Sequence, residues 1–446
     1  MKDQSAAPSS APQARGAAPA RVFVVGVGMT RFMKAQTGPD YPEMAREAVT
    51  AALRDAGLPY TAVEAVVAGY CYGEPTCGQR AVYEMGLTGV PVVNVNNNCS
   101  TGSTALFVAR NFVAGGLYSC ALALGFEKME RNLSQKYTDS GYTSPVARHF
   151  DYMFACGSNR QQVGRLNEMT GNVIKMFGDA ALEHQRKYGS NDAHLTTLAY
   201  KNHKHSVNNP YAQLQKEIPF AVIADGSRKL YGPITLFQAC ATADGAAAAL
   251  VCSEEFVKAH GLESQAVEIV AQALVTDVPS SFDLENKSFA NLCGFDLTSR
   301  GAQQVFRDSG LKPSDVDVLE VHDCFSVNEL LVMEAVGLCG KGEGGKLVDS
   351  GRWIRNAAGG ELFQVGGRWV VNPSGGLESK GHPIGATGLA QCAELCWQLR
   401  GKADKRQVEG AKVALQHNFG LGSAAVVTLY RVYSAQPSEA AAKARL

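Results

Sequence analysis

The chain has 446 residues, of which 46% are hydrophobic and 19% charged, which is enough apolar material for the cores of two or three domains. Its 42 Lys and Arg balance 42 Asp and Glu, so no net positive charge attracts nucleic acid. No apolar run approaches the roughly 20 residues that cross a bilayer, and we expect no stable membrane insertion. Twelve cysteines, without the density of a small secreted scaffold, indicate free thiols in a reducing compartment.

The two ends of the chain differ in composition from the rest. Residues 1–20 are rich in Ala, Ser and Pro and are expected to form a disordered leader. Residues 436–446 form an Ala-rich tail that ends in Ala444, Arg445 and Leu446, a variant of the Ser-Lys-Leu peroxisomal signal. We therefore predict the peroxisome or a related organelle, with the mitochondrion as the alternative because the leader could be a transit peptide.

The folded part is predicted to begin with a strand at residues 21–32, a β-branched run followed by glycines. A helix with 3.6-residue spacing follows at residues 41–58, and strands follow at residues 62–70 and 90–98. The last strand leads into a helix at residues 101–116. This alternation predicts an α/β protein with a largely parallel sheet covered by helices.

A long-period repeat divides the chain into two similar halves. Residues 55–71 align without a gap on residues 308–324, including an Asp-x-Gly-Leu helix end and the following strand. Later segments also correspond, and the helices after Cys99 and His382 begin at equivalent corners. We predict an N-terminal half at residues 21–126 and 241–275, an inserted loop domain at residues 127–240, and a C-terminal half at residues 276–435.

Cys99 has the sequence context of a catalytic nucleophile. It follows a predicted strand and three asparagines, and it precedes a predicted helix. A thiol at a helix N-terminus lies near the positive end of the helix dipole and among unpaired backbone N–H groups, which favour the thiolate and can bind an oxyanion. A buried structural thiol is the alternative, and the polar, glycine-rich surroundings argue against it.

His382 lies in SKGHPIGATG, at the equivalent corner of the second half. An imidazole there can take the proton of Cys99, which is how a thiol nucleophile is activated near neutral pH. A helix-capping or core histidine is the alternative. His417, in QHNFGLG, is less certain, because Asn418 and Gly420 could supply polar and backbone donors in its place.

His322 and Cys324 lie in VHDCFSVNE, at the end of the repeated strand. Side chains two residues apart on an extended segment point to the same side, so both can face one cavity. A thiol with a pKa near its usual value of about 8.5 exchanges protons at neutral pH, so Cys324 is predicted to carry a proton. A metal site is the rival interpretation, and we expect none because the paired Cys-x-x-Cys spacing is missing.

Four motifs in this order, NNNCSTGS, HDCF, SKGHPIGATG and HNFGLG, together with the paired halves and the inserted region, resemble the thiolase superfamily and within it the SCP2-type thiolases. The resemblance runs from Arg21 to about Tyr433. It implies the thiolase fold, with two similar βαβαβαββ halves in a layered α/β arrangement and an inserted loop domain. It also implies an acyltransferase that uses coenzyme A as a substrate and binds no permanent cofactor.

The same resemblance implies a role for each motif. Cys99 attacks the keto carbon of a 3-ketoacyl-CoA and carries the shortened acyl group as a thioester. His382 activates Cys99 and, with His322, binds the thioester oxygen of the departing enolate, which Cys324 protonates. The backbone N–H groups of Cys99 and Gly420 form a second oxyanion site.

Most thiolases carry their acid/base cysteine in a Cys-x-Gly motif, and the matching position here is Asn418. The second thiol is therefore expected at Cys324, which is the SCP2-type arrangement, and Asn418 is expected to orient other groups. The inserted region is expected to cover coenzyme A, with Lys201, Lys204 and His205 as candidates for phosphate contacts. A hydrated, charged helix face is the equally weighted alternative for these residues.

The expected reaction is cleavage of 3-ketoacyl-CoA by coenzyme A, giving acetyl-CoA or propionyl-CoA and a shortened acyl-CoA, in β-oxidation of fatty acids or of branched or sterol side chains. A condensing enzyme of the same fold, working in the synthetic direction, is one alternative. An inactive acyl-CoA-binding protein is the other. The resemblance also predicts a homodimer, with a tetramer as the alternative.

Overall fold

The computed structural model describes residues 20–130, residue 133 and residues 143–434. Most of the predicted leader and the predicted signal Ala444, Arg445 and Leu446 lie outside the described residues, so their roles stay predictions. All twelve cysteines lie inside them and are free thiols. No helix in the described ranges combines the length and apolar character needed to span a bilayer.

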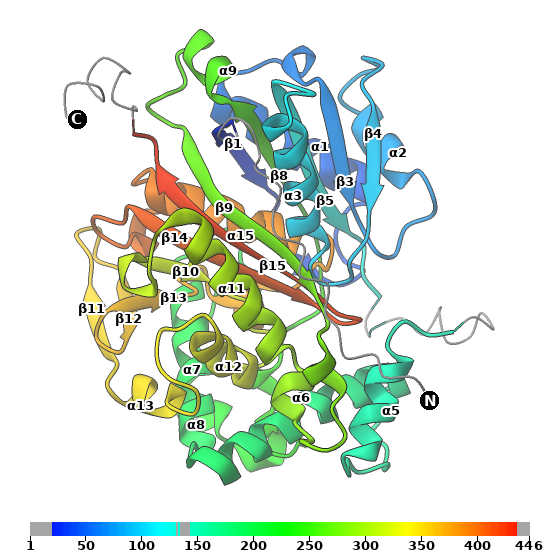
Figure 1. Ribbon diagram of the computed structural model, residues 1–446, viewed down its shortest axis with the longest axis vertical. Coiled ribbons are helices and arrows are strands. Elements are labelled where there is room, and N and C mark those ends of the chain that lie inside the picture. Colours follow the sequence, from blue (N-terminus) through cyan, green and yellow to red (C-terminus); the bar gives the residue numbers. More distant parts are fainter. Residues whose placement is uncertain (1–19, 131–132, 134–142, 435–446) are drawn as a thin grey trace, which may run out of the picture.

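One large sheet runs through the molecule (Figure 1). Its strands follow the order β11-β12-β13-β10-β14-β15-β9-β1-β8-β5-β3-β4, and β2 pairs with β8 beside this path. Their bounds are β1 Val22–Met29, β2 Met33–Lys34, β3 Ala65–Gly69, β4 Val92–Val95, β5 Cys120–Glu127, β8 Ala243–Ser253, β9 Val267–Thr276, β10 Val318–Glu320, β11 Arg352–Arg355, β12 Glu361–Val365, β13 Trp369–Val371, β14 Val413–Gly420 and β15 Ala424–Val432.

The strand order confirms the two similar halves. In the first half the order is β4-β3-β5-β8-β1, and in the second it is β13-β10-β14-β15-β9. In each half the first three strands are parallel and the last two pairings are antiparallel. The prediction of a largely parallel sheet was therefore wrong. The sheet is mixed because β14 and β15 form a hairpin, whose short connection permits only antiparallel pairing, and because β1 and β9 join the halves antiparallel.

The helices repeat in the same way. Helix α1 packs on β1 and β8, and α11 packs on β9 and β15. Helices α3 and α15 contact each other between the two halves. The helix bounds are α1 Tyr41–Ala56, α2 Cys77–Tyr83, α3 Thr101–Ala114, α5 Ala147–Ala155, α6 Glu168–Tyr188, α7 Asp192–Ser206, α8 Phe220–Ile223, α9 Glu254–Ala259, α10 Phe289–Leu292, α11 Phe295–Ser309, α12 Ser326–Ala335, α13 Gly344–Asp349, α14 Gly376–Lys380 and α15 Thr387–Leu399.

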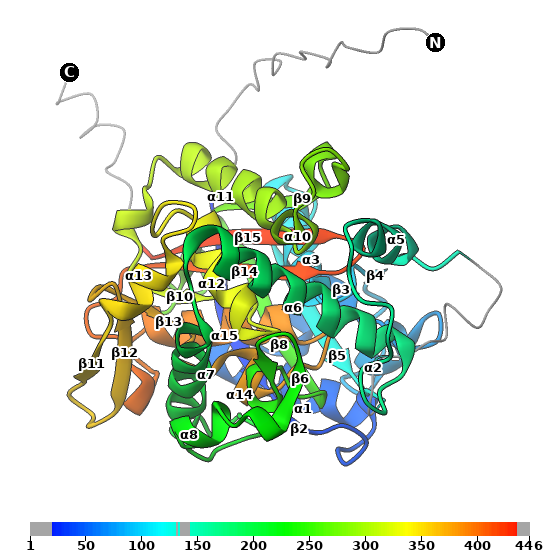
Figure 2. The same ribbon diagram turned by 90° about the horizontal axis from the view of Figure 1, so that it is seen from below.

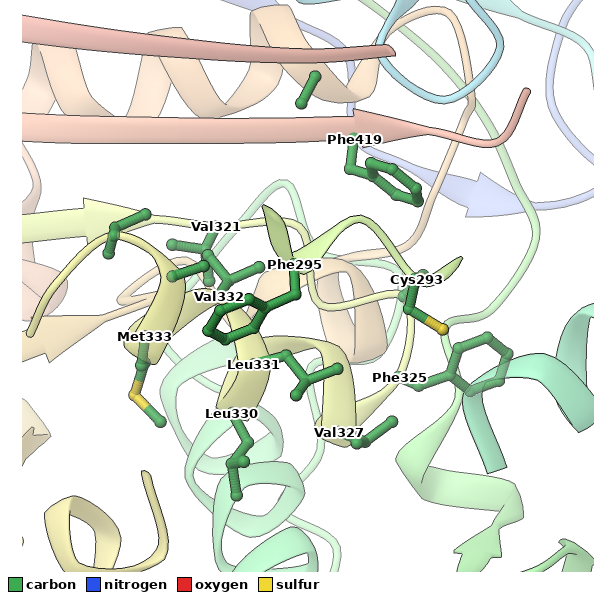
Figure 3. Packing of buried hydrophobic residues seen from close by; sticks show 14 of the residues in the cluster. Cys293, Phe295, Val321, Phe325, Val327, Leu330, Leu331, Val332, Met333 and Phe419 are labelled. Atoms are coloured by element: carbon green, nitrogen blue, oxygen red, sulfur yellow. The ribbon is translucent and has the colours of Figure 1, made fainter. Parts of the chain in front are cut away.

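The segment between β5 and β8 carries α5 to α8 and a small two-stranded sheet, β6 Lys229–Tyr231 with β7 Ile234–Thr235. Figure 2, seen from below, shows α6, α7 and α8 across the underside of the second half. Helix α6 packs on α10 and α12, and its buried side chains share a core with those of α12. Figure 3 shows the part of this core around α12, with Phe295, Leu331 and Val332 among the packed side chains.

Candidate active site

Cys99 lies between the end of β4 and the start of α3. Asn98 has a φ of +50°, a left-handed conformation that asparagine tolerates better than most residues. Its Nδ2 donates to the carbonyl oxygen of Leu421 at 3.1 Å, and Asn97 N donates to Thr101 Oγ1 at 2.8 Å. These contacts hold Cys99 at the first turn of α3, where it lines two cavities.

His382 lies between α14 and α15, and its ring is held in one tautomer. Its Nδ1 is 2.6 Å from Thr387 Oγ1, and that hydroxyl donates to the carbonyl oxygen of Pro383 at 3.0 Å. A hydroxyl has one hydrogen, so Thr387 Oγ1 accepts a hydrogen bond from Nδ1–H of His382. The Nε2 atom of His382 therefore carries the lone pair, and it is buried with no hydrogen-bond partner among the described residues.

The opposite tautomer is fixed at His322, which follows β10. Asn418 Nδ2 donates to the carbonyl oxygen of Cys99 at 3.0 Å and lies 3.2 Å from His322 Nδ1. Because a carbonyl oxygen only accepts, the NH₂ end of Asn418 faces this side, and its second hydrogen is directed at Nδ1. His322 thus carries its proton on Nε2. Asn418 orients both the backbone of Cys99 and the ring of His322, in agreement with the role expected for it.

The thiol and the two imidazoles form one cluster. Cys99 Sγ and one ring nitrogen each of His322 and His382 all lie within 4.8 Å of one another, and the two ring centroids are 5.1 Å apart. The cluster therefore combines a thiol, an imidazole lone pair and an imidazole N–H donor. His417 is directed elsewhere, since its Nε2 lies 3.0 Å from Thr298 Oγ1, and it is not among the described residues that line the two cavities.

A second thiol, at Cys324, lines the same cavity as Cys99, and the structure adds a third at Cys240. Cys240 N donates to the carbonyl oxygen of Cys324 at 2.9 Å, next to an antiparallel bridge between Ala239 and Phe325. Residues opposite each other on paired strands point to the same side. Cys240 lies just before β8, and no motif in the sequence marks it as part of the site.

Gly420 is the last residue of β14, and it lies against the Cys99 corner. A Cβ atom at this position would be 2.3 Å from Asn97 O and 3.0 Å from Cys99 N. Only glycine fits there. This close approach places the backbone of Gly420 beside the backbone nitrogen of Cys99, and its part in an oxyanion site stays a prediction.

The larger of the two cavities beside Cys99 has a volume of about 560 Å³ and a mainly apolar wall. Helix α6 supplies Val173, Ile174 and Phe177, and Lys34 and Gln213 are among the polar lining residues. The second cavity, of about 510 Å³, shares Leu133 and Leu421 with the first. Cys99 therefore borders enough space for a ligand of considerable size.

Burial dominates the ionisation of the site. It raises the pKa of Cys99 to about 12, with Glu127 adding to the effect, and it raises the pKa of Cys324 well above the usual range. The predictions of a stabilised thiolate at Cys99 and of an ordinary pKa at Cys324 were therefore wrong for the resting protein, because the cost of burying a charge exceeds the helix-dipole effect. Burial also lowers the pKa of His382 to about 3, so thiol and imidazole are both neutral.

Glu127, at the end of β5, ties the two corners of the site together. Its carboxylate accepts hydrogen bonds from Cys71 N, Tyr72 N and Gly385 N. Burial raises the pKa of Glu127 to about 7, while these N–H donors lower it. Gly385 is three residues beyond His382, so Glu127 helps to hold the loop that carries this histidine.

The three residues predicted to contact phosphates lie on α7, and the structure does not bring them to the Cys99 cluster. Lys201 is fully buried, with its Nζ 2.6 Å from Glu329 Oε1. His205 Nδ1 donates a hydrogen bond to Asn372 O, and His205 Nε2 accepts one from Phe363 N. Burial lowers the pKa of His205 to about 3. Lys204 alone is partly exposed, and it pairs with an exposed glutamate at 3.1 Å. Of the Lys-x-x-Lys-His pattern, Lys201 serves a core ion pair, His205 serves core hydrogen bonds, and Lys204 lies at the surface.

Comparison with known proteins agrees with this geometry. Residues 22–230 match the family model of the thiolase N-terminal domain, and residues 285–431 match that of the thiolase C-terminal domain-like family. The chain is 56% identical to sterol carrier protein 2 of Oryctolagus cuniculus over 417 residues, covering 92% of this chain and 72% of that protein. It is 31% identical to acetyl-CoA acetyltransferase of Methanothermobacter thermautotrophicus, covering 92% and 99% of the two chains.

A solved structure, the Ltp2-ChsH2(DUF35) aldolase, has a TM-score of 0.70 at 21% identity and covers 93% of this chain and 98% of its own. At this identity the likeness shows the fold. The family models and the 31% identity to acetyl-CoA acetyltransferase show an acyltransferase with a layered α/β fold. The chain belongs to the thiolase family, and the resemblance to SCP2-type thiolases is confirmed.

Proposed function

We propose that the protein is a 3-ketoacyl-CoA thiolase, which cleaves 3-ketoacyl-CoA with coenzyme A to acetyl-CoA or propionyl-CoA and a shortened acyl-CoA. The observation that carries the proposal is the free lone pair of His382 Nε2 within a cluster that holds Cys99 Sγ and His322 at the wall of an apolar cavity. This combination supplies a nucleophile, its base and a hydrogen-bond donor at one point.

In the first half of the reaction, Cys99 Sγ attacks the keto carbon while His382 Nε2 takes the thiol proton. The negative charge on the former keto oxygen is held by the backbone N–H groups of Cys99 and Gly420. The carbon–carbon bond then breaks, leaving the acyl group on Cys99 and an enolate whose oxygen accepts from Nε2–H of His322. Cys324 gives its proton to the enolate carbon.

In the second half, the thiol of incoming coenzyme A gives its proton to the Cys324 thiolate, and its sulfur attacks the acyl group on Cys99. Cys99 leaves as a thiolate and recovers its proton from His382. All protons are then back in their starting positions. Between the two halves Cys324 is a thiolate and His382 an imidazolium, so their opposite charges offset each other. The high pKa of both thiols favours the return of their protons at the end of the cycle.

The apolar cavity accommodates the acyl chain, and Gln213, which lines it, has a buried Oε1 atom with no partner among the described residues. This acceptor suits an amide N–H of the pantetheine arm, and Lys34 in the same lining suits a phosphate. We place the reaction in β-oxidation and expect a homodimer.

A thiolysis assay tests the function. Absorbance of acetoacetyl-CoA and of longer 3-ketoacyl-CoA is followed after addition of coenzyme A, for wild type, Cys99→Ala, Cys324→Ala and Cys120→Ala. We expect no turnover for Cys99→Ala and a loss of about 100-fold or more for Cys324→Ala, because each removes a reacting group. Cys120→Ala removes a buried thiol of β5 outside the cavity and is expected to stay active. Substantial thiolysis by Cys99→Ala would disprove the proposal.

A further inference from the structure

A group of buried charged side chains lies next to the cavity wall. The Nδ2 atom of Asn202 is 3.0 Å from Asp323 Oδ2, 2.8 Å from Glu329 Oε2 and 3.2 Å from Glu378 Oε2. Lys201 joins them through its ion pair with Glu329 at 2.6 Å. All five residues are at most 1% exposed. We refer to these five residues as the carboxyl cluster.

Full ionisation would place three negative charges against one positive charge inside the carboxyl cluster. Uncompensated charge in the protein interior is costly, so a buried group of this kind keeps a proton instead. Glu329 and Asp323 have the stronger ion-pair or hydrogen-bond partners. Glu329 pairs with Lys201 and accepts from Asn372 Nδ2 at 3.2 Å, and Asp323 accepts from Leu377 N at 2.7 Å. Burial and the charges of Glu378 and Glu329 nevertheless raise the pKa of Asp323 well above its usual range, so Asp323 holds a proton.

Glu378 is the least compensated of the three. The Asn202 amide has two hydrogens, and its two shorter contacts are to Glu329 and Asp323. Ser326 Oγ lies 2.6 Å from the other oxygen of Glu378, and a hydroxyl can accept a hydrogen bond from a protonated carboxyl as well as donate one to a carboxylate. Burial, and secondarily the charge of Glu329, raises the pKa of Glu378 to about 8, although Ser326 lowers it. Glu378 therefore holds a proton at neutral pH as well.

Glu378 also faces the reaction cavity, in the same wall as Cys240, Cys324 and His382. We propose that Glu378 is a positioning residue that holds a proton at neutral pH and so keeps the wall beside Cys324 uncharged while Cys324 exchanges a proton with the substrate. This proposal rests on the proposed function. Loss of the proton would add a negative charge beside the thiols, where it opposes both a thiolate and an enolate.

Glu378 is not the only carboxyl with a raised pKa near the site: burial raises the pKa of Asp323 well above its usual range and that of Glu127 to about 7. Variants of Glu378 itself are therefore needed to identify the group responsible. Lys380, on the same helix, is directed to Glu320 at 3.1 Å and forms a separate pair. His382 has a pKa of about 3 and Cys99 a pKa of about 12, so both titrate far from pH 8. The groups facing Glu378 are Lys201 and Asn202 from α7, Ser326 and Glu329 from α12, Asp323 and Cys324 before α12, and Cys240 before β8.

Deuterium exchange into the methyl group of acetyl-CoA isolates the step that Glu378 is proposed to affect. In this exchange the carbon–hydrogen bond breaks and the proton moves to the Cys324 thiolate, followed by return of a deuteron from solvent. The Cys324 thiolate becomes more abundant in every variant as the pH rises, so rates are compared at each pH. We expect the ratio of the wild-type rate to the Glu378→Gln rate to fall by about tenfold between pH 7 and pH 9, for a single ionisation of Glu378. Glu378→Met, which does not titrate either, is expected to keep a constant ratio to Glu378→Gln.

Two variants serve as controls. Glu361→Gln removes an exposed carboxyl on β12 and keeps the fall in this ratio. Cys240→Ser also keeps it, since its thiol is not the group that titrates. A ratio of the wild-type rate to the Glu378→Gln rate that stays constant from pH 7 to pH 9 overturns the proposal.

Infrared spectroscopy reads the proton without relying on turnover. The difference spectrum of wild type minus Glu378→Gln should contain the carbonyl stretch of a protonated carboxyl at pH 7. This band should diminish by pH 9. If Glu378 is ionised at pH 7, the band is missing. A missing band overturns the proposal even in an active enzyme. If the band is present and wild type exchanges no deuterium, Glu378 is protonated but the proposed thiolase function has failed. The proposed effect of Glu378 on proton exchange at Cys324 then fails with that function.

Discussion

Thr387 decides which nitrogen of His382 is free to act as a base. Its hydroxyl donates to Pro383 O and accepts from His382 Nδ1–H, so a side chain outside the cavity fixes the lone pair on Nε2. We expect Thr387→Val to lower kcat for thiolysis by about 5- to 150-fold, because about 1–3 kcal/mol is lost with a buried hydrogen bond and the inactive tautomer becomes populated. Thr387→Ser keeps the hydroxyl and should retain activity. Steady-state kinetics of the two variants decide the point, and equal kcat values for both would contradict the assignment.

The same residue-scale chemistry explains why the thiols are protonated at rest. Burial raises the pKa of Cys99 and Cys324 and lowers that of His382 and His322. A protein that stored a thiolate would need a nearby cation, and burial removes the stabilisation that water gives such a charge. The proton is therefore transferred during attack, when the oxyanion site receives the charge that leaves the sulfur.

At the scale of elements, the site depends on how closely α3 and α15 approach each other. A Cβ on Gly388 would lie 2.3 Å from Ser103 N and 2.5 Å from Asn418 Oδ1. We expect Gly388→Ala to lower the free energy of unfolding by about 1–3 kcal/mol through overpacking. It should also lower kcat, because displacement of Asn418 releases His322 and the Cys99 backbone.

Gly226→Ala is the matched control, since nothing lies within 4 Å of the added carbon. It should be neutral or stabilising by about 0.4–1 kcal/mol. Urea unfolding and thiolysis rates check both variants. A Gly388→Ala protein with wild-type stability would show that the helices can separate without cost.

At the scale of the whole molecule, the repeat in the sequence predicts the architecture well. Residues 65–69 and 318–320 became β3 and β10, and the two corners at Cys99 and His382 meet across the interface of the halves. Two motifs in equivalent places of a duplicated fold are brought together by its pseudo-symmetry, so Cys99, His322 and His382 could be found before the structure. The antiparallel joining of β1 and β9 could not, because it depends on pairing between halves.

The errors in the site have one physical cause, which is that sequence does not show burial. Lys201 and His205 lie in a polar stretch of the sequence, but α7 packs beneath the second half. Lys201 therefore forms a buried ion pair, and the ring of His205 forms buried hydrogen bonds. Burial also changes the ionisation of Cys99 and Cys324. Cys240 and Glu378 reach the cavity through tertiary contacts that no local motif marks.

Burial of neutral histidines also has a consequence for the stability of the whole molecule. The pKa of His205 is lowered to about 3 by burial and secondarily by Lys201, whereas an unfolded histidine has a pKa of about 6.5. Between these values the unfolded chain binds a proton that the folded protein does not. The stabilisation from a neutral His205 is therefore present above pH 6.5 and is lost progressively as the pH falls towards 3.

Glu127 and Glu378 change the free energy of unfolding in the opposite direction on acidification, because their pKa values in the folded protein are raised to about 7 and about 8. The pH dependence of wild type alone therefore does not show the effect of one histidine. His205→Gln keeps a donor for Asn372 O and an acceptor for Phe363 N but does not titrate. Urea unfolding at pH 7.5 and pH 5.5 should show wild type losing about 1.4 kcal/mol more than His205→Gln on acidification. Equal losses in the two proteins would mean that His205 becomes protonated in the folded state, and that its two hydrogen bonds do not hold it neutral.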